Sequence, residues 1–131
     1  MHRHLHLLLI ALIAFSLTSC STPSRFPVLN FTTHNATSTD LNWVTINWGE
    51  WQISSGVLSA GIFASQYYPV RREPPHSDSA SLTFIEDSSR QRHNIPLNVS
   101  EVRQLRDGIY MVTFRITSLT NADVVIKPEK R

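Results

Sequence analysis

Apolar and polar residues alternate in short runs along most of the chain from Leu41 onward. The clearest run is Ile109 to Thr117, in which every second residue is apolar: Tyr110, Val112, Phe114 and Ile116. Side chains on a β-strand point alternately to its two faces. The pattern therefore predicts a strand with these four side chains in a hydrophobic core.

A second run surrounds the dipeptide Gly49-Glu50. Ile46 and Trp48 alternate with polar residues before it, and Ile53 to Leu58 continues after it. A glycine at the first central position of a two-residue turn is typical of a type II′ hairpin. We therefore expect a hairpin that places Trp48 and Trp51 opposite each other.

The remaining segments are shorter and complete the outline. An apolar stretch covers residues 60–68, a loop is expected at 69–79, and strands are expected at 81–86, 90–97 and 123–127. Asn98 followed by Glu101 resembles a capping box, which predicts a short helix from Val99 to Arg106. Six or seven short strands with one short helix predict an all-β fold, either a small sandwich or a barrel.

One local motif bears on the choice between sandwich and barrel. Leu105, Gly108 and Tyr110 are spaced as in the tyrosine corner of immunoglobulin-like sandwiches, where a tyrosine at the start of a late strand bonds to the backbone just upstream. The resemblance covers about six residues. It implies an immunoglobulin-like sandwich, although the paired cysteines of antibody domains are missing.

The first 20 residues have the pattern of a secretion signal. Arg3 and several histidines are followed by an apolar run from Leu7 to Phe15, which is shorter than the roughly 20 residues that a transmembrane helix needs. Leu17-Thr18-Ser19-Cys20 resembles a bacterial lipobox. The resemblance implies cleavage before Cys20, a lipid on its thiol and acylation of its new amino group. The alternatives are an ordinary signal peptide with a chance cysteine and, less expected, a retained transmembrane anchor.

These features divide the chain into three parts. Residues 1–19 are the expected signal peptide, residues 20–40 the lipidated cysteine with a flexible tether rich in Ser, Thr, Asn and Pro, and residues 41–131 the β domain. Within the tether, Phe26 to Phe31 could dock on the domain as an edge strand. The residue after Cys20 is Ser21 and not the aspartate that retains lipoproteins at the inner membrane. The resemblance therefore favours the outer membrane, facing the periplasm, over the inner membrane.

Charge and composition narrow the function further. The chain has 12 Lys and Arg against 10 Asp and Glu, and one cation, Arg3, lies in the expected signal. The mature part is thus nearly neutral, which argues against a nucleic-acid partner. The single cysteine, Cys20, excludes an internal disulfide.

No motif indicates catalysis or a cofactor. The mature histidines are His34, His76 and His93, and none has a second histidine or a cysteine at the spacing of a metal site. The sequence contains neither a Gly-x-Ser-x-Gly motif nor a glycine-rich phosphate loop. We therefore expect no catalytic residues, no bound metal and no cofactor.

The aromatic residues are the stronger candidates for binding. The three tryptophans are expected to be mainly core residues, with Trp43 and Trp48 on opposite strand faces; any exposed one would suit a glycan ring or a protein partner. A second group, in and beside the loop, combines residue types enriched at interfaces: Tyr67, Tyr68, Arg71 and Arg72. The alternative for this group is an ordinary solvated loop.

Together these observations predict a membrane-anchored, non-enzymatic periplasmic lipoprotein that binds or scaffolds another envelope protein. The alternative is a periplasmic immunity or inhibitor protein that blocks a toxin or a hydrolase. Capture of partners from membranes separates the two, since the first predicts an envelope assembly and the second a single toxin or enzyme.

Overall fold

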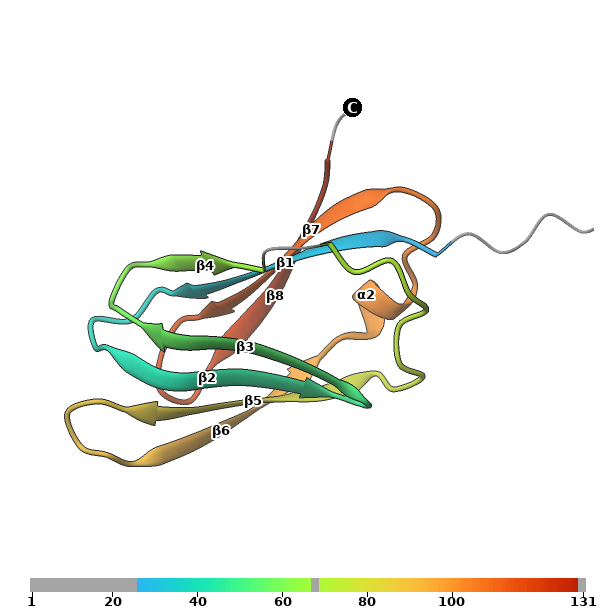
Figure 1. The fold of residues 1–131 in the computed structure, drawn as a ribbon. Coiled ribbons are helices and arrows are strands. Elements are labelled where there is room, and N and C mark those ends of the chain that lie inside the picture. The colour runs from blue at the N-terminus through green and yellow to red at the C-terminus, as the bar shows by residue number, and fades with distance from the viewer. Residues whose placement is uncertain (1–25, 67–68, 130–131) are drawn as a thin grey trace, which may run out of the picture.

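The computed structural model describes residues 26–66 and 69–129, which form two β-sheets packed face to face (Figure 1). The strands are β1 (Val28–Asn35), β2 (Leu41–Trp48), β3 (Trp51–Leu58), β4 (Phe63–Ser65), β5 (Ser79–Glu86), β6 (Arg92–Asn98), β7 (Ile109–Ile116) and β8 (Ala122–Pro128). One short helix, α2 (Ser100–Arg103), connects β6 to β7. The predicted all-β fold is confirmed, and it is the sandwich and not a closed barrel.

The strand order shows how the two layers are joined. One sheet has the order β4-β1-β7-β8 and the other β3-β2-β5-β6. All neighbouring strands are antiparallel except β1 and β7, which run parallel in register from Val28↔Ile109 to Asn35↔Ile116. This order differs from that of immunoglobulin constant domains, in which the first, second, fifth and fourth strands share a sheet.

The core lies between the sheets and is built from the inward-facing residue of each alternating pair. Its fully buried large side chains are Leu29, Phe31, Leu41, Val44, Ile46, Trp48, Leu58, Leu82, Phe84, Val99, Phe114 and Ile116. Phe31 of β1 stacks on Phe114 of β7 with the ring centroids 5.7 Å apart. On β7 the prediction holds for Val112, Phe114 and Ile116, while Tyr110 is half-buried.

The Tyr110 hydroxyl makes the bond that the tyrosine-corner resemblance implied. It donates a hydrogen bond to the backbone carbonyl of Asp107, at a long 3.4 Å. The intervening Gly108 has a φ of +141°, and a side chain there would contact the Tyr110 ring at about 3 Å. The glycine therefore lets the ring close over the turn that begins β7.

The expected tether is wrong in its extent, because the folded domain begins well before Leu41. Residues 28–35 form β1, which lies between β4 and β7 and is not the edge strand that its sequence allowed. Leu29 and Phe31 face the core from this strand, followed by Thr33 and Asn35. Because polar residues occupy some of its inward-facing positions, β1 lacks the apolar–polar alternation that predicts a strand.

The side chain of Asn35 can be fully buried because hydrogen bonds satisfy both the nitrogen and the oxygen of its amide. Its Nδ2 donates to the backbone carbonyls of Thr39 (2.7 Å) and Leu58 (2.9 Å). Its Oδ1 accepts from the backbone N–H (3.0 Å) and the hydroxyl (2.6 Å) of Thr37. One side chain therefore fixes the turn after β1 and joins it to the end of β3, as buried polar groups require.

Two smaller elements also differ from the prediction. Of the apolar stretch at 60–68, the described residues 60–66 contribute the three residues of β4, with Phe63 and Ile62 exposed. The helix covers Ser100–Arg103 and not Val99–Arg106. Asn98 accepts a hydrogen bond from the Ser100 N–H (3.0 Å) but does not cap the helix, because the N-cap residue is Val99.

Candidate functional site

The predicted hairpin is present and anchors the first candidate surface. Trp48 and Trp51 are opposite each other across Gly49-Glu50, and their rings meet edge to face at 5.4 Å. Gly49 has a φ of +54°, and Glu50 has no positive φ, as a type II′ turn requires. Trp48 is buried and its indole N–H donates to the carbonyl of Ser77 (2.8 Å), which ties the hairpin to the loop before β5.

The loop at residues 69–78 is held against the tip of this hairpin. A Cβ placed on Gly49 would lie 2.6 Å from the Cβ of Pro75, so the backbone of the turn touches the proline ring directly. Pro74 is buried, and Val70 exchanges backbone hydrogen bonds with Leu29 of β1. A hollow of about 440 Å³ between hairpin and loop is lined by Gly49, Glu50, Trp51, Glu73, Pro74, Pro75, His76 and Ser77.

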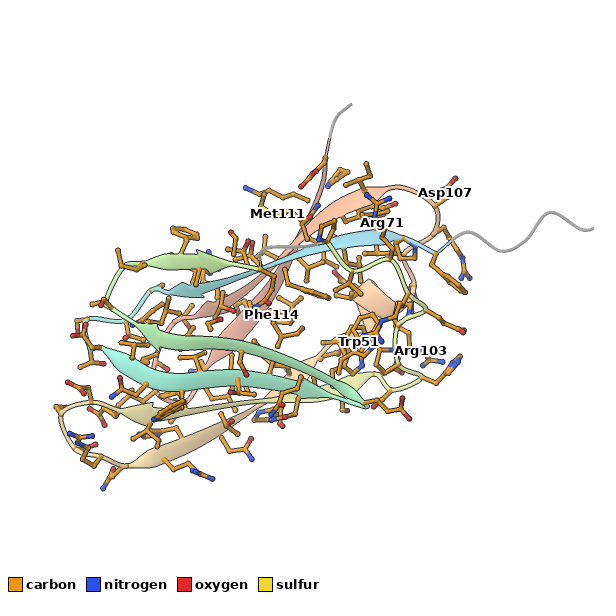
Figure 2. All side chains as sticks on the ribbon, in the orientation of Figure 1. Trp51, Arg71, Arg103, Asp107, Met111 and Phe114 are labelled. Atoms are coloured by element: carbon orange, nitrogen blue, oxygen red, sulfur yellow. The ribbon has the colours of Figure 1, made fainter. Side chains whose placement is uncertain are left out.

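The two predicted arginines are both exposed on this loop, and Arg72 contacts the hairpin. Its guanidinium carbon lies 5.6 Å from the centre of the Trp51 ring, within cation–π range. Figure 2 shows Arg71 near β1 and β7, above Trp51. Tyr67, Tyr68 and Cys20 lie outside the described residues. We call Trp51, Arg71, Arg72 and the loop residues 73–77 the hairpin–loop surface.

Trp43 forms a second candidate surface, on the outer side of the sheet β3-β2-β5-β6 to which the hairpin also belongs. It is 73% exposed and has a φ of +54°. It sits in a β-bulge, because Leu41 pairs with Leu58 but Val44 with Gly56. The left-handed conformation costs a residue with a Cβ roughly 1–2 kcal/mol. The tryptophans therefore divide: Trp48 is core, Trp51 half-buried and Trp43 exposed, with Trp43 and Trp48 on opposite faces as expected.

His93 and Glu86 form a pair that the sequence did not predict. His93 of β6 stacks on Phe84 (5.2 Å), and its Nε2 lies 3.5 Å from Oε2 of Glu86. The same carboxylate accepts hydrogen bonds from Ser89 (2.7 Å) and Ser88 (3.1 Å). The Ser89 bond, with smaller contributions from Ser88 and His93, lowers the pKa of Glu86 although burial acts to raise it.

This pair does not have the arrangement of a catalytic triad. The serines bond to the carboxylate and not to the imidazole, whereas a triad places histidine between the other two. Among residues 26–66 and 69–129, no group of three His, Cys, Asp or Glu is arranged to hold a metal ion.

Comparison with known proteins gives structural likeness at low sequence identity. No family model matches the sequence, and no curated protein sequence matches it significantly. Among solved structures, the chain is similar to a protein from Eubacterium rectale determined by NMR, with a TM-score of 0.47 and 10% sequence identity over 79% of this chain and 91% of that one. In the described part of the chain, no helix is long and apolar enough to cross a membrane.

Proposed function

We propose that this chain is a bacterial lipoprotein whose β-sandwich is a non-enzymatic binding module for another protein of the cell envelope. The lipid is carried by Cys20, and the domain faces the periplasm from the outer membrane. The observation that supports a binding role most directly is the hairpin–loop surface, where Arg72 is exposed above Trp51 on a loop that is already fixed in place.

Such a surface is suited to binding because little order is lost when a partner arrives. Pro75 rests on the hairpin tip and Trp48 holds the carbonyl of Ser77, so both ends of the hollow are fixed beforehand. Association then orders few additional groups, which lowers its entropic cost. Arginine and tryptophan are the residue types that most often dominate the energy of a protein interface.

The length of chain before β1 sets where this surface can act. Phe26, the first described residue, is six residues after Cys20. Even fully extended, six residues span only about 20 Å. A domain lipidated at Cys20 would therefore lie close to the membrane, and its partner would be an envelope protein near the same surface.

The first test concerns the anchor. Cys20→Ser should abolish labelling of the protein by a fatty-acid probe and its partition into detergent. Continued labelling of Cys20→Ser would show that the lipoprotein assignment is wrong. Phase partition of the two purified proteins gives a second readout, because an unlipidated sandwich should remain in the aqueous phase.

The second test concerns the contact surface. Arg71→Ala combined with Arg72→Ala should weaken partner capture from solubilised membranes by about tenfold or more. The matched control is Lys127→Ala, which removes an exposed cation from β8 and should leave capture unchanged. The melting temperature should fall by only a few degrees, since an exposed cation–π contact contributes about 0.5–1 kcal/mol.

The identity of the captured protein decides the class of function. A stoichiometric envelope assembly supports the binding module, and a single toxin or hydrolase would replace it by the immunity or inhibitor function. Unchanged capture by the double variant would remove the hairpin–loop surface from the proposal.

A further inference from the structure

The sheet β3-β2-β5-β6 (Figure 1) carries an unusual set of side chains on its outer side, among them Trp43. Strand register aligns them in three rows: Gln52, Asn47, Ser81 and Pro96; Ser54, Thr45, Thr83 and Asn94; and Val57, Asn42 with Trp43, Ile85 and Arg92. We call these residues the Trp43 face.

The bulge in β2 explains the backbone at Trp43 but not its side chain. By inserting one residue, the bulge lets both Leu41 and Val44 point into the core although they are three positions apart. In this bulge the residue at position 43 has a positive φ, and Gly or Asn would adopt that conformation with less strain. Trp43 is instead the largest residue available, and it is 73% exposed. Its ring therefore gains little from burial within this chain.

The surroundings of Trp43 are rich in uncharged hydrogen-bonding groups. It lines a hollow of about 340 Å³ together with Thr45, Asn47, Gln52, Thr83, Phe84, Ile85 and Arg92. The Thr45 hydroxyl is bonded to the Trp43 carbonyl (3.3 Å) and so supports the bulge. Within the described residues, the side-chain amides of Asn47 and Gln52 make no hydrogen bond. These amides remain available to a ligand.

The charge on the Trp43 face is one-sided. Its three rows contain no aspartate or glutamate, and Arg92 forms no ion pair with any described residue. Asp87, in the turn after β5, reaches the face through a hydrogen bond from Asn42 (2.7 Å). The row that contains Trp43 thus ends in one cation that forms no ion pair with a described residue, beside neutral donors and acceptors. This cation is complementary to a ligand that carries a carboxylate.

We propose that the Trp43 face binds a carboxylate-bearing glycan strand of the bacterial cell wall. Trp43 stacks on one sugar ring, and Asn47 and Gln52 bond to hydroxyl or acetamido groups. Arg92 pairs with the lactyl carboxylate of a muramic acid unit that carries no stem peptide, because in a peptide-bearing unit this carboxyl is an amide. A protein partner fits less well, because beside Trp43 the exposed apolar groups are limited to Val57, Ile85 and Pro96, and interface centres are more apolar. The choice of cell-wall glycan rests on the periplasmic location proposed above.

The binding experiment uses the purified full chain in mild detergent and two forms of the glycan. Co-sedimentation with isolated peptidoglycan sacculi should pellet the wild-type protein. Tryptophan fluorescence should report saturable binding of a soluble disaccharide of N-acetylglucosamine and N-acetylmuramic acid. Trp43→Ala should weaken both by about tenfold or more, and Trp43→Phe should recover part of the loss because a ring is retained.

Two further variants make the assignment specific. Arg92→Gln should weaken binding of the carboxylated disaccharide but not of neutral chitotetraose, which lacks the acid. Phe63→Ala removes a comparably exposed aromatic ring (60%) from the other sheet and should leave binding unchanged. Trp43→Ala should melt within a few degrees of the wild type, so that a loss of binding cannot be attributed to unfolding.

The result distinguishes this proposal from that of protein binding. Arg71→Ala with Arg72→Ala should leave sedimentation with sacculi intact, and Trp43→Ala should leave capture of the envelope protein intact. Absence of saturable binding to sacculi, or equal binding by wild type and Trp43→Ala, would overturn the glycan proposal. Loss of protein capture by Trp43→Ala without glycan binding would reassign the face to a protein.

Discussion

Replacing Asn35 by alanine should destabilise the domain far more than the replacement of an exposed polar residue in the segment that resembles a tether. The substitution removes two hydrogen-bond donors and one acceptor from a fully buried position. It leaves the Leu58 carbonyl without its side-chain donor inside the protein and frees the Thr39 carbonyl and Thr37 N–H at the adjoining turn.

The structure sets the size of this effect. An unpaired buried polar group costs about 1–3 kcal/mol, and at least one of the three groups is deeply enclosed while water reaches the others more easily. We expect Asn35→Ala to lower the free energy of unfolding by about 2–5 kcal/mol, a large share of a typical total of 5–15 kcal/mol. The melting temperature should fall by roughly 10–30 °C.

The matched control lies on the same strand. Asn30 faces the opposite side of β1 and makes one exposed side-chain bond, to Glu129 (3.0 Å). Asn30→Ala should therefore change stability by no more than about 0.5 kcal/mol. Thermal and urea unfolding, followed by circular dichroism, measure both variants. If Asn35→Ala had the same melting temperature as Asn30→Ala, residues 26–40 would not belong to the cooperative folding unit. The hydrogen bonds of Asn35 would then make no net contribution to the free energy of unfolding.

Three further predictions concern the core, the hairpin and pH. Phe114→Ala should lower the free energy of unfolding by about 3–5 kcal/mol, and a near-normal melting temperature would contradict the buried face of its strand. Gly49→Ala should cost about 1–3 kcal/mol, since a Cβ at positive φ meets Pro75 at 2.6 Å; an unchanged melting temperature would show that loop and hairpin are not in contact. Ser89→Ala should raise the pKa of Glu86, because it removes the largest cause of the lowering. A carboxyl group with a lowered pKa in the folded protein contributes its full stability above the pKa of the unfolded chain, and this stability is lost as the pH falls through the folded pKa. The variant should therefore melt at a lower temperature than wild type at neutral pH and at the same temperature at about pH 2. A difference in melting temperature that persists in acid would contradict this mechanism.

The elements that depend on local alternation were predictable from the sequence. The residues of β7 carry their period of two without interruption, and the Gly49-Glu50 turn is encoded by two adjacent residues. The strand can be recognised because its inward-facing positions are apolar. The turn can be recognised because glycine prefers the positive φ that the turn requires. The pairing of Trp48 with Trp51 follows directly from the length of the turn.

The features that depend on distant partners were not predictable in this way. In β1, Thr33 and Asn35 are buried because partners in other segments satisfy them, and their polarity made the segment resemble a tether. The cation–π contact between Arg72 and Trp51 joins residues 21 positions apart in the sequence, and no local pattern predicts it. The bulge at Trp43 is similar, since it becomes visible only when the register of β2 against β3 is known.

The parallel pairing of β1 with β7 also governs the order in which the domain can fold. Val28 pairs with Ile109, so the sheet that contains both strands cannot close until nearly the whole chain is available. Contacts between such distant segments slow folding, commonly to milliseconds or longer. If the proposed lipoprotein crosses the inner membrane unfolded, this delay is useful. The emerging precursor lacks the strand against which β1 must pair, and the native sandwich forms only after the hairpin of β7 and β8 has crossed.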